Sequence, residues 1–336
     1  LEDGTTRQVN HETWQMVWNP TTKSYDESFF PQVLGERIFS KAVDYNGDGL
    51  MDYITVSSAN EQFYTAKGIY LNDGKGGFTQ QAFTAQDADG NDYTFASSAI
   101  DVADFNNDGL VDIVGIGNTP VNGVQVYTNS VLINQGNNKF VAVATDLISA
   151  KVGLPTVMAT DLNNDGYADF VICGNADQSS GSANEPDRYF NAYLNLGEEG
   201  LEAGLPSFYS LDLPDQDIYQ IGYGAIQCAD YNNDGIMDIF ATGENPKIAM
   251  QLGAAGEWGW VPQVLMGTGE GQFVRQTQTI MSAHLNPLNS SSTAIRSVDV
   301  DGDGNMDILV PGWCQKTPTG GDTGAQTGYV YLNANG

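Results

Sequence analysis

Nine-residue acidic segments with one fixed spacing of oxygen-bearing side chains occur five times in this chain of 336 residues. Each follows the pattern Asp-x-Asn/Asp-x-Asp-Gly-x-x-Asp, and in chain order the segments are residues 44–52, 104–112, 161–169, 230–238 and 299–307. Alternate oxygen ligands, a glycine at position 6 and a backbone carbonyl at position 7 are how a short loop surrounds a hard cation such as Ca²⁺. The pattern therefore predicts five calcium loops.

The expected ligands are the side chains at positions 1, 3, 5 and 9 and the backbone carbonyl at position 7. They are Asp44, Asn46, Asp48, Leu50, Asp52, Asp104, Asn106, Asp108, Leu110, Asp112, Asp161, Asn163, Asp165, Tyr167, Asp169, Asp230, Asn232, Asp234, Ile236, Asp238, Asp299, Asp301, Asp303, Asn305 and Asp307. We expect about five Ca²⁺ ions with a structural role, because a unique active site is seldom copied in every repeat. The alternative is a set of polar turns without metal.

Strands, not helices, are expected on both sides of each loop. An EF-hand requires a bidentate Glu at position 12, and the residues at that position are Thr55, Gly115, Ile172, Ala241 and Val310. A short apolar run typical of a β-strand follows every loop. The predicted unit is therefore strand, calcium loop, strand.

The near-regular recurrence of the loops indicates a repeat architecture. Each repeat contains up to four strand-like runs, and four-stranded units repeated around an axis form a β-propeller. The sequence thus predicts an all-β fold in which residues 1–336 form a single propeller domain with five blades. The repeats lie at approximately residues 36–93, 94–153, 154–219, 220–288 and 289–336.

The last repeat has no fourth strand-like run. Residues 1–35 contain two such runs, at residues 14–18 and 24–30. We expect this N-terminal hairpin to complete the last blade and close the ring. A sixth, degenerate blade on residues 10–30 is the alternative.

The loop pattern, the strand after it and the hairpin sequence YLNDGKGGF at residues 70–78 resemble the FG-GAP/VCBS repeat family. Its best-known members are the β-propellers of integrin α subunits. The resemblance covers nearly the whole chain and implies a calcium-binding propeller. It says less about function, because the family serves adhesion, sugar binding and enzymes alike.

The composition points to a secreted protein without nucleic-acid partners. A net charge of −29 and a pI near 4.1 argue against nucleic acid and anionic membranes. Three cysteines make no disulfide framework, and no apolar run is long enough to span a membrane. No signal peptide begins at Leu1, so we expect a chain from which the signal has been removed. Calcium loops of this type suit millimolar extracellular calcium. We therefore expect an exported, monomeric bacterial protein that is periplasmic, extracellular or at the cell surface.

Insertions between the second and third strands lengthen the last three repeats, at residues 174–189, 243–260 and 312–327. These connections should lie on the face opposite the calcium loops. Aromatic rings there could stack on sugar rings, although the tryptophans could instead pack the insertions onto the propeller. The candidate ligand-binding residues are Trp258, Trp260, Trp313, Tyr64 and Tyr127.

The leading hypothesis is a non-enzymatic module that binds a glycan or a protein through this insertion face. A polysaccharide lyase or glycoside hydrolase is the first alternative, and an integrin-like adhesion or scaffold protein is the second. No catalytic residue is assigned, since the metalloprotease, serine-hydrolase and phosphate-loop motifs do not occur. If the protein were a glycosidase, the first candidates would be four acids in the insertions, Asp187, Glu244, Glu257 and Asp322. The acidic segment 87–92 lacks the full loop pattern and is expected to be a turn.

Overall fold

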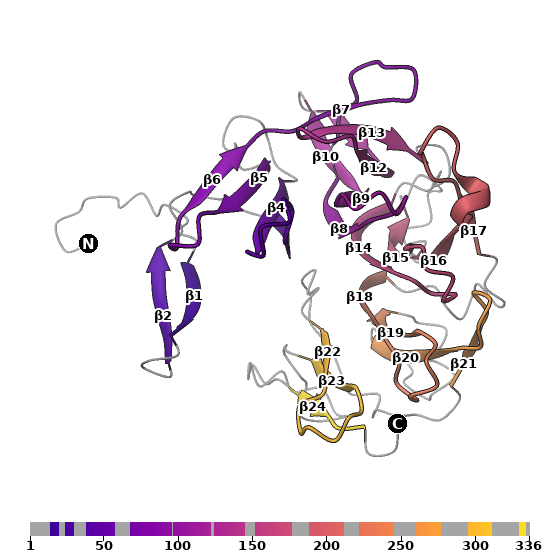
Figure 1. Ribbon diagram of the computed structural model, residues 1–336. Coiled ribbons are helices and arrows are strands. Elements are labelled where there is room, and N and C mark those ends of the chain that lie inside the picture. The colour runs from indigo at the N-terminus through magenta and orange to yellow at the C-terminus, as the bar shows by residue number, and fades with distance from the viewer. Residues whose placement is uncertain are drawn as a thin grey trace, which may run out of the picture.

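A computed structural model describes residues 14–19, 24–29, 38–57, 68–95, 97–121, 124–144, 152–176, 188–211, 222–244, 260–276, 295–310 and 329–333. The chain forms an all-β, five-bladed β-propeller whose blades follow one another around a ring (Figure 1). Among the described residues the one helical element is the 3-10 helix η1 (Gly197–Gly200). No helix in that part of the chain is long and apolar enough to span a membrane. The predicted fold class and number of blades are confirmed.

Neighbouring strands within each blade run antiparallel in chain order. Blade 1 contains β3 (Ile38–Val43), β4 (Asp52–Ser57), β5 (Gly68–Asn72) and β6 (Phe78–Gln81). Blade 2 contains β8 (Ala99–Ala103), β9 (Asp112–Ile116), β12 (Ser130–Asn134) and β13 (Lys139–Val143). Blade 3 contains β14 (Val152–Thr160), β15 (Asp169–Ala176), β16 (Arg188–Asn195) and β17 (Phe208–Ser210). Blade 4 contains β18 (Gly222–Ala229), β19 (Asp238–Glu244), β20 (Trp260–Gly267) and β21 (Phe273–Arg275).

Blade 5 has three described strands, β22 (Arg296–Val298), β23 (Asp307–Val310) and β24 (Tyr329–Tyr331). The N-terminal strands β1 (Trp14–Asn19) and β2 (Ser24–Phe29) pair with each other in a separate two-stranded sheet. Completion of the last blade by this hairpin is therefore not found among the described strands. Among the described strands β1 pairs only with β2, and β24 pairs only with β23.

Two additions distinguish blade 2 from the others. Strand β7 (Thr84–Gln86) extends its sheet by pairing parallel to β13. Strands β10 (Asn118–Val121) and β11 (Val124–Tyr127) form a separate hairpin between β9 and β12. Blade 2 thus has a fifth strand on its outer edge.

The core consists of apolar clusters between successive blades. Between blades 2 and 3, the rings of Phe105, Phe170 and Phe208 meet edge to face, with centroids 5.2–6.3 Å apart. The middle strands are covered by a neighbouring blade on each face, so every residue of β9 and β12 is buried. This two-sided burial explains their near-continuous apolar sequences. Full burial of each such ring stabilises the fold by about 1.5–3 kcal/mol.

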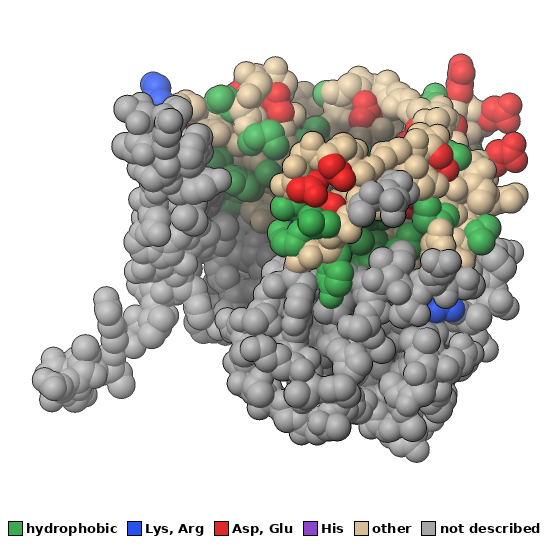
Figure 2. All heavy atoms as spheres, turned by 90° about the horizontal axis from the view of Figure 1, so that it is seen from below, with side chains coloured by type: hydrophobic (Ala, Val, Ile, Leu, Met, Phe, Trp, Pro, Cys, Tyr) green, Lys and Arg blue, Asp and Glu red, His purple; other side chains and the backbone are tan. Residues whose placement is uncertain are grey.

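Acidic side chains project from the surface that Figure 2 shows, whereas Lys and Arg are sparse over its described part. This agrees with the net charge of −29.

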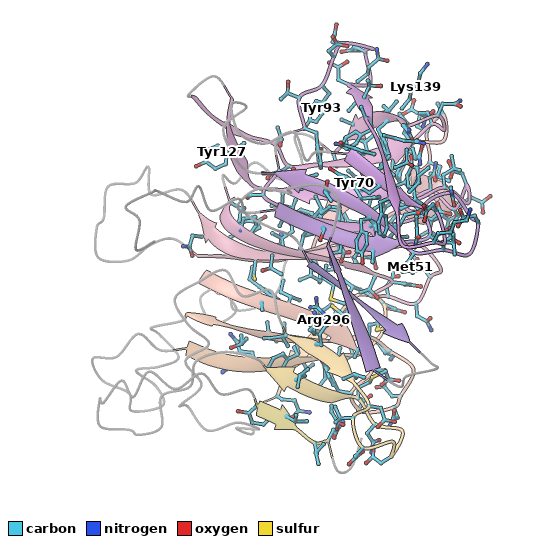
Figure 3. The ribbon with its side chains drawn as sticks, turned by 90° about the vertical axis from the view of Figure 1, so that its left-hand side faces the viewer. Met51, Tyr70, Tyr93, Tyr127, Lys139 and Arg296 are labelled. Atoms are coloured by element: carbon cyan, nitrogen blue, oxygen red, sulfur yellow. The ribbon has the colours of Figure 1, made fainter. Side chains whose placement is uncertain are left out.

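Strand register brings all five acidic loops to one edge of the propeller. The last residue of each first strand pairs with the ninth residue of the loop, as in Val43 with Asp52 and Ala103 with Asp112. At the other end of blade 3, Val152 pairs with Ala176, next to the predicted insertion. Figure 3 accordingly shows Met51, in the first loop, and Tyr127 at opposite edges of the molecule.

One face of blade 5 is exposed to solvent, although residues at the equivalent positions of blades 1, 2 and 3 are buried. Val298, Val300, Val330 and Leu332 are 44–58% exposed. The residues that match Val330 in blades 1, 2 and 3 are fully buried against the next blade: Ile69, Val131 and Ala192. The packing that joins the first four pairs of blades is thus absent from this face of blade 5 within the described residues.

Two buried thiols offer a test of the packing between blades 3 and 4. Cys173 and Cys228 lie in the same apolar cluster, and burial raises the pKa of the Cys173 thiol to about 12. About one such thiol in ten thousand is ionised at pH 8, and the thiolate is the reactive form. In a Cys314→Ser background, we predict that neither thiol reacts with Ellman's reagent in the native protein and that both react in urea. Labelling of the native protein as fast as free glutathione would contradict the described packing.

Candidate metal centres

The carboxylate at position 1 of each loop folds the loop around itself. In the third loop, Asp161 accepts N–H bonds from Asp165 at 3.2 Å and Gly166 at 2.8 Å. Asp165 in turn accepts the Tyr167 N–H at 2.8 Å. The same three bonds recur in the other four loops. The acids at positions 1 and 5 therefore fix the backbone conformation of all five loops.

Left-handed backbone occurs at positions 4 and 6 of every loop. At position 6 the φ angles are 83° to 92°, and the residues are Gly49, Gly109, Gly166, Gly235 and Gly304. At position 4 they are 56° to 79°, and the residues are Gly47, Asn107, Asn164, Asn233 and Gly302. Gly and Asn are the residues that adopt this region most readily. The restriction of position 4 to Gly or Asn is a sequence signal that our pattern left unspecified.

The Asp at position 9 is buried and accepts two backbone N–H groups from different strand ends. Asp169 Oδ2 accepts the Leu162 N–H at 2.8 Å, and Oδ1 accepts the Asn195 N–H at 2.7 Å. The corresponding pairs of bonds occur in every loop. All five ninth residues have at most 1% of their surface exposed. This residue therefore joins the calcium loop to the third strand of its blade.

Burial makes several of these carboxylates hard to ionise. It raises the pKa of Asp112 and of Asp169 to about 7, although the backbone N–H bonds oppose the shift and the neighbouring loop acids add to it. The pKa of Asp238 is raised for the same reason. The pKa of Asp307 is lowered instead, because the N–H groups of Asn333 and Val300 stabilise its charge. A cation bound beside Asp112, Asp169 or Asp238 would favour the charged form of that carboxylate.

The donor set fits a calcium ion. In the fifth loop, Asp299, Asp301 and Asp307 each offer a carboxylate oxygen, and these oxygens lie within 4.8 Å of one another. Calcium binds oxygen at about 2.3–2.6 Å, so ligands on opposite sides of one ion lie about 5 Å apart. The other four loops have Asn at position 3, an uncharged oxygen donor. The ligand role of the position 7 carbonyls stays a prediction.

An Asn at the end of the third strand was missed as a site residue, although its recurrence was visible in the sequence. Asn195 Nδ2 donates to the Ala168 carbonyl in its own loop at 3.2 Å. It also donates to the Phe105 carbonyl in the preceding blade's loop at 2.8 Å. Asn134 and Asn333 make equivalent bonds to their own loops and to the preceding blades. The loops are thereby hydrogen-bonded to one another across blade boundaries.

Blade 4 departs from this arrangement. Gly267 stands in the place of the Asn, and its N–H still donates to Asp238 at 2.8 Å. A side chain at this position would collide with the Met237 carbonyl. The junction between blades 3 and 4 therefore lacks the amide link that joins the loops elsewhere in the described structure.

Few of the predicted ligand-face residues can be placed. Tyr127 ends β11 and is half-buried, and Trp260 begins β20. Trp258, Trp313 and Tyr64 lie outside the described residues, as do Asp187, Glu257 and Asp322. Glu244 is the last residue of β19. The described chain brings the loop residues together, and the predicted aromatic surface stays a prediction.

Comparison with known families gives one match. The family model described as an FG-GAP-like repeat matches residues 44–115, 104–172 and 230–310. These matches contain all five acidic loops, and they extend over more than half of the chain. No curated protein matches the chain significantly.

Substitution at position 6 tests the left-handed backbone. A Cβ added to Gly166 would meet no atom within 4 Å, and φ there is +90°. Gly166→Ala should therefore lower the free energy of unfolding by conformational strain alone, about 1–2 kcal/mol. Asn164→Gly, at φ +61° in the same loop, is the control and should change it by less than about 1 kcal/mol. Urea unfolding in the presence of a chelator measures the free energy of unfolding of both variants. Equal losses in Gly166→Ala and Asn164→Gly would contradict the explanation by backbone strain.

Removal of the strand-end amide tests the link between blades. Asn195→Ala breaks the bonds to both loops, whereas among the described residues Asn72 Nδ2 donates only to Met51 in its own loop. We expect Asn195→Ala to lower the free energy of unfolding by about 1–3 kcal/mol more than Asn72→Ala, because it leaves an additional buried carbonyl without a donor. Urea midpoints under identical conditions give this difference. A smaller loss in Asn195→Ala than in Asn72→Ala would show that the inter-blade bond contributes no stability.

Proposed function

Because this chain belongs to the FG-GAP-like repeat family, we propose that it is an exported recognition module whose propeller is stabilised by calcium. An FG-GAP propeller fits a binding or recognition role in general. The observation that carries the calcium proposal is the fifth loop, where carboxylate oxygens of Asp299, Asp301 and Asp307 lie within 4.8 Å of one another. In this proposal the side chains at positions 1, 3, 5 and 9 bind the ion, which neutralises their mutual repulsion.

Charge supports the same proposal. The chain carries 42 acidic and 13 basic residues, and a compact state with this imbalance is destabilised by its own repulsion. Divalent ions at the loops would reduce that repulsion where it is most concentrated. Calcium sites of extracellular modules bind in the range of about 10⁻⁴–10⁻³ M, so ions of this affinity would be bound outside the cell and lost at cytosolic calcium levels.

The proposed ligand is a glycan or a protein, bound at the edge opposite the loops. The strand ends at Ala176 and Glu244, which lead into the insertions, lie at that edge. The loops are nearly identical in every blade and offer no unique surface, whereas connecting segments that differ between blades can provide one. Binding to a glycan array and to candidate proteins, with and without calcium, tests this assignment. Ligand binding that survives deletion of all three insertions would contradict it.

Chelation should weaken the fold substantially. A site at a calcium concentration 100 times its Kd contributes about 2.7 kcal/mol, so filling most of five loops should raise the melting temperature by more than about 10 °C. Differential scanning calorimetry in excess EGTA and in 10 mM CaCl₂ measures the change. Elemental analysis after dialysis against calcium should give a stoichiometry near five.

Magnesium in place of calcium is the control for the melting experiment. Mg²⁺ demands octahedral geometry and keeps several of its water ligands, so it should raise the melting temperature less than Ca²⁺ does. Identical melting in EGTA and in calcium, with no metal in the purified protein, would sink the proposal.

A further inference from the structure

A cavity of about 670 Å³ lies between the outer edges of blades 2 and 3. One wall is the end of β13 with the turn that follows β7, and the other is the segment that leads into β17. Figure 1 shows these strands at the outer rim of the ring. No predicted site residue lines this cavity.

The floor of the cavity is apolar and built from both blades. Ala142 and Phe208 are at least nine-tenths buried, and Pro206 is buried with them. Leu205 and Val143 add partly buried surface next to the cluster between the blades. The floor thus offers a short apolar track of the kind that an aliphatic chain could cover.

Hydrogen bonds hold both walls in place. Glu202 and Leu205 exchange two backbone bonds of 3.0 and 2.9 Å, and the Gly204 carbonyl accepts Asn106 Nδ2 from the second acidic loop at 2.9 Å. Across the cavity, Asp87 N–H donates to the Asn91 carbonyl at 2.9 Å. The cavity is therefore formed before any ligand arrives, which lowers the entropic cost of binding.

The rim carries negative charge. Among the described residues that line the cavity, Asp87, Asp89 and Glu202 are acidic and none is Lys or Arg. The Asp87 carboxylate closes its own turn by accepting the N–H groups of Asp89 and Asn91 and the Asn91 side chain. Asp89 and Glu202 are exposed, so their charge is available to a ligand.

We propose that this cavity receives a lysine or arginine side chain from a partner protein. The aliphatic stem would lie on the floor at Ala142 and Phe208, and the cationic head would lie between Asp89 and Glu202. Long basic side chains bury their stems on apolar surface while the head stays hydrated. A neutral sugar would leave the acidic rim unused. The inference rests on the proposed recognition role and specifies a protein partner with a basic anchor residue.

Methyl NMR of the calcium-saturated, full-length protein with labelled alanines tests the proposal. The probes are N-acetyl-lysine methylamide and its uncharged analogue N-acetyl-norleucine methylamide. Ala144 and Ala203, with φ of +57° and +54°, tolerate glycine and can be assigned by Ala→Gly substitution. The lysine probe should shift the cavity methyls in a saturable manner, and the norleucine probe should bind at least about five-fold more weakly.

Charge removal gives the matched comparison. The double variant Asp89→Asn/Glu202→Gln should weaken lysine binding about five-fold or more, and raising NaCl from 0.15 to 0.5 M should weaken it in the wild type. Glu199→Gln, an exposed acid in η1 outside the cavity lining, should leave it unchanged. Equal melting temperatures of the variants exclude a folding defect.

Three results would overturn the proposal: no shift up to the solubility limit of the probe, equal binding of norleucine, or unchanged binding in the double variant. Shifts of the cavity methyls on adding calcium beyond saturation of the loops would overturn it as well, in favour of a metal site. These failures would not affect the calcium proposal, which is judged by melting temperature and metal content alone.

Discussion

A buried carboxylate that accepts two backbone N–H groups underlies the structure of every blade. In blade 3, Asp169 has no exposed surface and binds the N–H groups of Leu162 and Asn195. These groups belong to the start of the loop and the end of the third strand, so one side chain fixes the register of three consecutive strands. The cost of burying its charge is offset only in part by the two bonds, as its pKa of about 7 indicates. This imbalance is the physical reason that a cation beside the carboxylate would stabilise the blade.

The same arrangement connects neighbouring blades. Asn195, the last residue of β16, donates its side-chain N–H to the Phe105 carbonyl in the loop of the preceding blade. In the other direction, Asn107 donates to the Gly166 carbonyl in the loop of the following blade. An ion bound in one loop would therefore order groups that the next loop depends on. Gly267 interrupts the amide link between blades 3 and 4, where packing around Cys173 and Cys228 provides the junction instead.

Sequence reasoning was most successful where the determining contacts are local. Hydrogen bonds within nine residues define each loop, so the order of Asp, Asn and Gly specifies its conformation almost completely, and the strands follow from apolar runs of fixed length. The N-terminal hairpin shows the limit. Its alternating pattern predicted a hairpin of two strands, which β1 and β2 confirm, but the pattern carries no information about which distant edge the hairpin joins. Among the described strands the hairpin does not pair with β24 of the last blade.

The sequence by itself determined the repeat, the five loops, the all-β class and the acidic character of the molecule. These properties depend on composition and on spacings of a few residues. Only the tertiary structure decided that Asp169 and its equivalents are buried junctions between loop and strand, that Asn195 joins two blades, and that a cavity with Glu202 on its rim lies between blades 2 and 3. The reason is that these hydrogen bonds join residues 26 and 90 positions apart, and the cavity is lined by residues of two blades; only the packing of successive sheets around the axis brings such residues together.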